Sequence, residues 1–508
     1  MLPSSLLLFL NALLSLSQLA NAEQIRLTSE NEAASHLRLS DQVHESIWTP
    51  EDHGRIRLPP HVGNIKSRPT LLYRPRSLEV LHRNRLRSLR YAESDAEPVI
   101  WDPVEVEGPD VDDLHTLAQL ARMAGNAYAL PGHSNWYDVD PAWNRSFPFG
   151  WEESDGFRGH VFLSSDNSTI VLSIKGTTLQ GPTSKLDKFN DNLLFSCCCA
   201  RVDFSWVFRT VCDCYSGNFR CDSQCLTNAL IEDSLFYSIG VKLIDDLRKI
   251  YPRSNLWLVG HSLGGSLASL LGATYGLPAV AFEAPGERLA ATRLHLPLPP
   301  PMSSPSLPSP PALPSPSIPK AKSTSKFKWH LPRPKLRFPF PGKHTSQPSI
   351  PIPTQPPPPP AQPRVPTHHI ATTHVYHNAD PIPQGTCTGI GSPCAQAGYA
   401  LETRCHLGKS IVFDSVHKLG WGVDVRKHVI RQVITKVLEA DGVCWGDDDS
   451  DDKEDDDGNE DVLNKGRRKG KHGEKEPVEC TKYVPKRDYE RDCVDCFKWE
   501  FGDFKKDK

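Results

Sequence analysis

One short segment restricts the fold of this chain more than any other. An apolar run at residues 256–259 leads into Gly260-His-Ser-Leu-Gly-Gly265, and small residues follow to about Tyr275. The apolar run predicts a buried strand and the small-residue stretch predicts a helix. Gly260, Ser262 and Gly264 match G-x-S-x-G, in which a sharp strand-to-helix turn exposes a serine hydroxyl. We therefore expect Ser262 to be a nucleophile; the alternative is an ordinary glycine-rich turn.

The rest of the pattern alternates between helix and strand. Residues 231–250 carry apolar side chains at helical spacing, and residues 279–282 read as a further strand. Two strands joined by a polar turn are expected within 159–174, and a helix is expected to begin at Asp110 as its N-cap. A final amphipathic helix follows His428. This alternation predicts an α/β-hydrolase type of fold with a central, mostly parallel sheet.

A nucleophilic serine needs a histidine base and a carboxylate, which follow the serine in chain order in this type of fold. Asp380 comes directly after a short β-prone run and before a proline, and we predict it as the acid. His428, at a loop-to-helix junction, is the favoured base. Competing candidates are Asp414 and Asp424 for the acid, and His406 and His417 for the base.

The tetrahedral oxyanion of such a reaction needs preorganised hydrogen-bond donors. One is expected from the backbone N–H of Leu263, the residue after the nucleophile. Thr177 follows the strand that ends near Lys175, so it is the second predicted donor, through its N–H and its hydroxyl. The alternative for Gly176-Thr177 is a simple strand-ending turn. Neither the motif nor the mechanism calls for a metal or a cofactor.

The cysteines indicate an oxidising compartment. Seven of the 14 fall between Cys197 and Cys225, so one of these seven is either free or pairs elsewhere. A zinc site at the CxxC pair Cys493 and Cys496 is the alternative. Asn144 and Asn167 begin Asn-x-Ser/Thr triplets, which predict glycosylation on a luminal surface.

Composition divides the chain into parts. The net charge of −3 is near zero, with no basic stripe interleaved with aromatic residues, which argues against a nucleic-acid partner. The apolar N-terminal run ends in Ala20-Asn21-Ala22, and its residues alone leave open a cleaved signal or a membrane anchor. The expected parts are an anchor (1–22), a weakly ordered lead-in (23–100), the first part of the core (101–296), a proline-rich basic insertion (297–366), the second part of the core (367–445), a charged linker (446–476) and a cysteine-containing tail (477–508).

Several motifs together resemble the class 3 lipases and, among them, the fungal autophagy-related vacuolar lipase family. They are Ser173-Ile-Lys-Gly-Thr-Thr178, Leu258-Val-Gly-His-Ser-Leu-Gly-Gly265, Ala281-Phe-Glu-Ala-Pro-Gly286, His377-Asn-Ala-Asp-Pro-Ile-Pro383 and the segment from His417 to His428. The family's serine, aspartate and histidine fall on Ser262, Asp380 and His428. The position of the cysteine cluster implies a lid that includes Trp206 and Phe208; the alternative is a disulfide-stapled loop that buries these aromatic residues. The proline-rich insertion departs from the family pattern.

The resemblance also implies a function. It is that of a lipase or phospholipase which hydrolyses acyl esters of membrane lipids and lyses autophagic bodies and multivesicular-body vesicles inside the vacuole. It further implies a single-pass anchor with a luminal catalytic domain, passage through Golgi and endosomes, and phosphoinositide binding. The alternatives are a secreted esterase or triacylglycerol lipase, and a non-enzymatic membrane adaptor.

Overall fold

The structure is a computed structural model, and part of the chain is described in it. The described residues are 57, 64–91, 97–152, 156–178, 183–199, 211–233, 235–301, 368–388, 394, 399–445, 483–490 and 492–504. The predicted anchor, most of the proline-rich insertion, the charged linker, and Trp206 and Phe208 of the predicted lid lie outside these residues. Within them, no helix is both long and apolar enough to cross a membrane.

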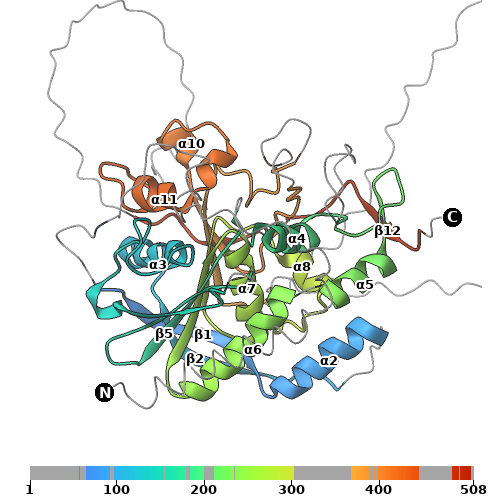
Figure 1. The fold of residues 1–508 in the computed structure, drawn as a ribbon, viewed down its shortest axis with the longest axis horizontal. Coiled ribbons are helices and arrows are strands. Elements are labelled where there is room, and N and C mark those ends of the chain that lie inside the picture. Colours follow the sequence, from blue (N-terminus) through green and yellow to red (C-terminus); the bar gives the residue numbers. More distant parts are fainter. Residues whose placement is uncertain are drawn as a thin grey trace, which may run out of the picture. The chain divides into compact units, whose positions relative to one another are not determined.

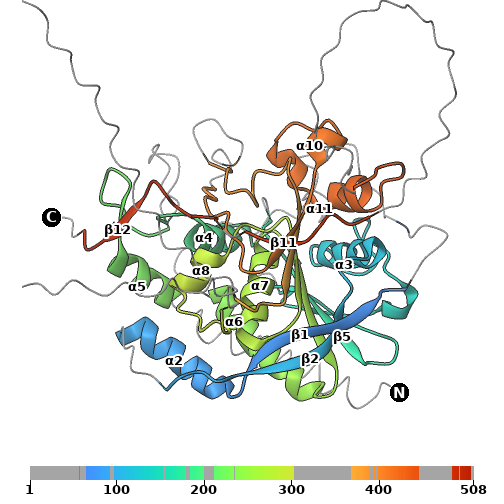
Figure 2. The same ribbon diagram turned by 180° about the vertical axis from the view of Figure 1, so that it is seen from behind.

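A central sheet forms the middle of the fold (Figures 1 and 2). It has eight strands in the order β11-β10-β9-β8-β7-β5-β4-β3. The five strands from β10 to β5 are parallel, and the remaining pairs of neighbours are antiparallel. The strands are β3 (Arg145–Phe149), β4 (Gly159–Leu163), β5 (Thr169–Ile174), β7 (Asn255–His261), β8 (Ala279–Phe282), β9 (Thr372–His377), β10 (Lys409–Phe413) and β11 (Asp488–Tyr489). The predicted mostly parallel sheet is confirmed, and the fold is that of the α/β-hydrolases.

Helices cover both faces of this sheet. Side chains alternate between the two faces along each strand, so apolar strands present a hydrophobic surface on each face. In β7, Trp257 and Val259 belong to one hydrophobic cluster and Leu256 and Leu258 to the other. The first cluster is covered by α3 (Leu114–Asn126), α11 (Ile430–Gln432) and η3 (Val433–Leu438). The second is covered by α6 (Leu235–Ile250) and α7 (Leu263–Tyr275), on the other side of the sheet (Figure 1). The helices are α2 (Leu78–Tyr91), α3 (Leu114–Asn126), α4 (Ser184–Phe195), α5 (Ser223–Asp233), α6 (Leu235–Ile250), α7 (Leu263–Tyr275), α8 (Arg288–Arg293), α10 (Ser415–Lys418) and α11 (Ile430–Gln432), with 3-10 helices η1 (Pro141–Trp143) and η2 (Val425–His428) and the π-helix η3 (Val433–Leu438).

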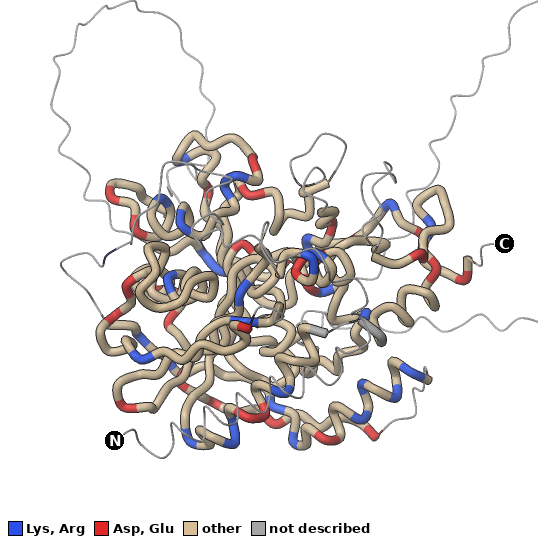
Figure 3. Tube along the Cα trace, viewed as in Figure 1, with Lys and Arg blue, Asp and Glu red and all other residues tan. Residues whose placement is uncertain are grey.

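The prediction of a weakly ordered lead-in is wrong for its second half. Residues of β1 (Ser67–Pro75) pair antiparallel with β2 (Trp101–Pro109), and α2 lies between them in the chain. Basic residues recur along α2 (Figure 3), yet Leu81, Arg85 and Leu89 are buried. The Arg85 guanidinium lies 4.8 Å from the centre of the Tyr237 ring and donates to the Leu294 carbonyl at 2.9 Å. The aliphatic part of the Arg85 side chain is buried while its guanidinium contacts a ring and a carbonyl oxygen. A polar sequence can therefore form a helix that packs on the core.

The proline-rich insertion enters between α8 and β9. At its two ends an isolated bridge pairs Pro301 with His368, and β9 then takes its place beside β8. Residues on both sides of the insertion therefore meet, so the sheet order is independent of the length of chain between them.

Disulfides attach the C-terminal tail to the core. Cys197 pairs with Cys496, and Cys405 pairs with Cys493. The zinc alternative at Cys493 and Cys496 is therefore wrong, and Cys197 is the member of the seven-cysteine cluster that pairs outside it. The other pairs between described cysteines are Cys198–Cys221, Cys199–Cys212, Cys214–Cys225 and Cys387–Cys394. The tail also adds β11 to the main sheet, and its β12 (Glu500–Gly502) pairs with β6 (Arg220–Asp222).

The N-cap of α3 differs from the prediction. Asp113, not Asp110, precedes the helix, and its carboxylate accepts from the Thr116 N–H at 2.8 Å. Both aspartates stand before the same apolar pattern, so local sequence did not separate them.

We predict that Asp113→Ala lowers the free energy of unfolding by about 1 kcal/mol, because an N-terminal amide of the helix loses its acceptor. Asp110→Ala is the matched control, since among the described residues the Asp110 carboxylate accepts the Asp112 N–H at 3.3 Å and lies 3.5 Å from Arg68, and it bonds to no amide of α3. Urea unfolding with the disulfides intact measures both. Equal losses would contradict the capping role of Asp113.

Candidate active site

The predicted strand-to-helix turn is present at Ser262. β7 ends at His261 and α7 begins at Leu263, and Ser262 between them has φ 58° and ψ −132°. A non-glycine residue with positive φ is uncommon and strained, and it occurs at functional sites. A Cβ at Gly264 would lie 2.1 Å from the Ile174 carbonyl oxygen, and one at Gly260 would lie 2.3 Å from the backbone of Gly264. Glycine is therefore required on both sides, because backbone occupies the space of a side chain.

The structure brings three of the predicted side chains into contact. The Nε2 atom of His428 lies 2.8 Å from Ser262 Oγ, and its Nδ1 atom lies 2.6 Å from Asp380 Oδ2. Ser262 follows β7, Asp380 follows β9, and His428 ends η2. Parallel strands end at the same edge of a sheet, so residues far apart in the chain meet there. This arrangement can activate a serine hydroxyl for attack on an acyl carbon.

The competing candidates are engaged elsewhere. The exposed ring of His417 lies 2.8 Å from Asp414, and Asp424 caps η2 by accepting from the Arg426 N–H. The buried ring of His406 uses Nδ1 for Glu490 at 2.7 Å and Nε2 for the Ala284 carbonyl at 3.1 Å. None of these pairs includes Ser262.

The acid of the triad is buried and remains ionised. Burial acts to raise the pKa of Asp380, but the charge and hydrogen bond of His428 and a hydrogen bond from Glu283 outweigh burial and hold the pKa below its usual value. Its second oxygen, Oδ1, accepts from the Ile382 N–H at 3.0 Å. The carboxylate is thus fixed from several sides and aims Oδ2 at the imidazole.

Two further histidines hold the backbone that carries His428. His261 lies with Nε2 2.8 Å from the His428 carbonyl oxygen and Nδ1 2.9 Å from the Tyr128 hydroxyl. Burial, with a smaller effect from His428, lowers the pKa of His261 to about 3, so this ring stays neutral. His377 similarly places Nε2 3.1 Å from the Lys427 carbonyl. Neither histidine was predicted to have a role, although both lie inside the lipase-like motifs; nothing in the sequence pointed to Tyr128.

The predicted oxyanion donors lie beside the serine. Leu263 is the first residue of α7, so its N–H belongs to the turn whose amides lack partners within the helix. A Cβ at Gly176 would lie 3.0 Å from Ser262 Cβ and 2.2 Å from the His261 carbonyl oxygen. The loop that carries Thr177 therefore packs directly against the turn.

Two buried acids hold this loop. Lys175 Nζ donates to Asp187 at 2.6 Å, and the Thr178 N–H donates to the same carboxylate at 2.9 Å. The Thr177 hydroxyl donates to Asp191. Burial raises the pKa of Asp191 to about 8, against the opposing hydrogen bond from Thr177. The loop is thus tied to α4 through both aspartates, which sequence reasoning did not identify.

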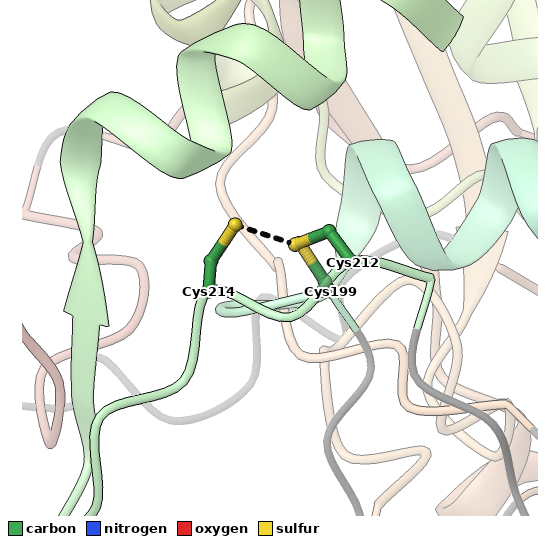
Figure 4. Close-up of side chains that lie close together, drawn as sticks. All are labelled: Cys199, Cys212 and Cys214. Carbon is green, nitrogen blue, oxygen red and sulfur yellow. Dashed lines mark hydrogen bonds between the residues drawn. A yellow bond between two sulfur atoms is a disulfide. The ribbon is translucent and has the colours of Figure 1, made fainter. Parts of the chain in front are cut away.

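Two clusters of potential metal ligands occur among the described residues. Cys199, Cys212 and Cys214 lie together (Figure 4), with the sulfur atoms of Cys212 and Cys214 2.9 Å apart. All three are in disulfides and offer no thiolate. Glu287, His374 and His406 form the other cluster, but both ring nitrogens of His406 already have partners. We therefore assign no metal to either cluster.

The predicted glycosylation sites are exposed. Asn144 follows η1, and Asn167 lies in the turn between β4 and β5. Exposure permits modification but does not test it, so glycosylation stays a prediction.

Comparisons with known proteins agree with this chemistry. The family model of the lipases (class 3) matches residues 199–277. A protein of Cryptococcus neoformans var. neoformans, provisionally named lipase ATG15, is 40% identical over 436 residues, which cover 80% of this chain and 70% of that protein. A Saccharomyces cerevisiae protein of the same name is 39% identical over 358 residues, covering 68% of this chain and 56% of the relative.

Solved structures of fungal lipases are also similar. The Lip2 lipase from Yarrowia lipolytica is 16% identical, covers 58% of this chain and 77% of its own, and has a TM-score of 0.26. At so low a score the likeness adds nothing to the fold, which follows from the strand order and the related sequences.

We predict that Gly176→Ala lowers kcat/KM for a soluble ester by at least about tenfold, because the new methyl group displaces the loop that carries an oxyanion donor. Gly422→Ala is the control, since a Cβ there meets open space. Initial rates on a short-chain ester measure the effect. Similar rates for both variants would contradict the close packing of this loop on the serine turn.

Proposed function

The chain belongs to the ATG15 lipase family, and from this premise we propose that Ser262, His428 and Asp380 hydrolyse the acyl esters of membrane lipids within the vacuole. The chain of contacts from Ser262 Oγ through His428 to Asp380 is the single observation that carries the proposal. It supports a serine carboxylic-ester hydrolase of the lipase or phospholipase type.

The proposed reaction has two halves. His428 Nε2 takes the proton of Ser262 while Oγ attacks the acyl carbon, and Asp380 orients the imidazole and stabilises its charged form. The backbone N–H groups of Leu263 and Thr177 hold the oxyanion, while the Thr177 hydroxyl bonds to Asp191. The protonated histidine then gives its proton to the leaving alcohol, and an acyl-enzyme remains. Water, deprotonated by His428, releases the fatty acid and restores the serine.

The proposed compartment follows from several independent features. Six disulfides between described cysteines fit an oxidising lumen. The exposed Asn144 and Asn167 are open to glycosylation there. The family resemblance adds a single-pass N-terminal anchor, transport through Golgi and endosomes, lysis of autophagic bodies and multivesicular-body vesicles, and phosphoinositide binding. These finer statements are part of the proposal.

We predict that Ser262→Ala abolishes fatty-acid release from both phospholipid vesicles and triglyceride emulsions, because no other group supplies the acyl acceptor. Purified full-length chain, wild type and variant, is tested on each substrate. Wild-type activity on vesicles supports the vacuolar membrane lipase. Activity on soluble esters alone would favour the secreted-esterase alternative, and equal activity of the variant would refute the serine mechanism.

We predict that Thr177→Val lowers kcat on a soluble ester by about 10- to 100-fold, since it keeps the side-chain shape but removes the hydroxyl that bonds to Asp191 and so holds the Thr177 N–H in place for the oxyanion. Thr177→Ser keeps the hydroxyl and is the matched control, expected to retain most of the activity. Comparable losses in both variants would assign the effect to packing of the threonine methyl group instead.

A further inference from the structure

Glu283 occupies a place that is unfavourable for a glutamate. It directly follows β8, has a positive φ of 44°, and its side chain is fully buried. A non-glycine residue in this backbone region is strained, and burial of a carboxyl adds to the cost. Such a combination persists only where neighbouring groups hold it, which directs attention to what Glu283 contacts.

Its contacts lead to the hydrolytic site. The His377 N–H donates to Glu283 Oε1 at 3.1 Å, and the Glu283 carboxyl hydrogen-bonds to Asp380. Asp380 is likewise fully buried. Two buried carboxyl groups in direct contact cannot both be ionised, so the pair shares one proton.

The surroundings decide which of the two carries the proton. Asp380 faces His428 at 2.6 Å and accepts from the Ile382 N–H, whereas Glu283 accepts only the His377 N–H among the described hydrogen bonds. Burial, the negative charge of Asp380 and the hydrogen bond to it raise the pKa of Glu283 well above its usual value. The proton therefore resides on Glu283.

The other ionisable groups nearby do not supply a competing charge. The His377 ring lies 3.9 Å from Glu283 Oε1, and burial lowers its pKa, so it stays neutral. Burial raises the pKa of the Tyr376 phenol and lowers that of His261, and both remain uncharged. Among the described residues around Glu283 and Asp380, His428 is the group that becomes a cation during the proposed reaction.

We propose that Glu283 is a positioning residue that acts through Asp380: its protonated carboxyl donates a hydrogen bond which keeps Asp380 ionised and aimed at His428 in acid. The inference rests on the proposed function and deepens it, since it concerns the acidic range in which a vacuolar enzyme works. No proton is transferred from Glu283 during turnover.

The effect on pH dependence has a definite sign. A hydrogen bond to the ionised form of Asp380 lowers the affinity of the Asp380–His428 pair for a further proton. Without that donor the pair binds the proton at higher pH. His428 is then protonated at a higher pH and can no longer act as the base, so the acid limb of the kcat/KM profile moves to higher pH.

Two near-isosteric variants separate hydrogen bonding from packing, because both keep a side chain at the same strained φ. Glu283→Gln retains a neutral donor to Asp380 and an acceptor for the His377 N–H. Glu283→Met retains only the bulk. On a soluble ester we expect Glu283→Gln to follow the wild-type profile from pH 4 to 8. For Glu283→Met we expect the acid limb to rise by about one pH unit, with about tenfold lower kcat/KM at pH 5.

Infrared difference spectra of wild type and Glu283→Gln provide a readout without catalysis. A protonated-carboxyl band that is present at pH 6 in the wild type and absent in the variant supports the proposal. Its absence from the wild type overturns the proposal. So do identical pH profiles for the Gln and Met variants. If Glu283→Met does not fold, Glu283→Gly, which relieves the backbone strain, takes its place in the same comparison.

The two hypotheses fail differently. A wild-type chain with no more ester turnover than Ser262→Ala would refute the proposed function, while the infrared band would still decide the state of Glu283. Ser262-dependent turnover together with an unshifted acid limb in Glu283→Met would refute the role of Glu283 alone.

Discussion

The close approach of the β7–α7 turn to β5 is the constraint on which the site depends. Gly260 and Gly264 leave no room for a side chain, so the first turn of α7 packs on backbone of the neighbouring strand and of its own turn. That packing places Ser262 at positive φ with its hydroxyl above the sheet edge. The strain is local, and the buried strands and helices on either side supply the stabilisation that maintains it.

Hydrogen bonds and ion pairs between buried polar groups hold the residues around Ser262 in place. Buried carboxylates near the site are each given a partner: Asp187 has Lys175, Asp380 has His428 and Glu283, and Asp191 has Thr177. The neutral rings of His261 and His377 hydrogen-bond to the backbone carbonyls of His428 and Lys427, respectively, and so hold the segment that carries His428. A polar network of this kind is rigid because each lost bond would leave a buried group unsatisfied.

Disulfides attach the C-terminal tail and the segment after α4 to the core. The described part of the C-terminal tail has two short strands, β11 and β12, and it is joined to the core through Cys405–Cys493 and Cys197–Cys496. Cys199–Cys212 likewise joins the two sides of residues 200–210, the segment in which a lid is predicted. Such cross-links stabilise the fold mainly because they reduce the conformational freedom of the unfolded chain.

The sequence alone determined the sheet type, the nucleophile turn and the identity of Ser262, because these depend on local periodicity and on glycine at fixed spacing. It reduced the acid and base to a few candidates, and family motifs then favoured Asp380 and His428. It placed the α3 cap three residues early and missed the order of α2, since a cap depends on one side-chain bond and α2 on distant partners such as Tyr237. Only the tertiary structure decided the disulfide pairs and the contacts of Glu283, His261 and Tyr128. These join residues far apart in the chain, and no local pattern encodes which buried groups will meet where parallel strands end.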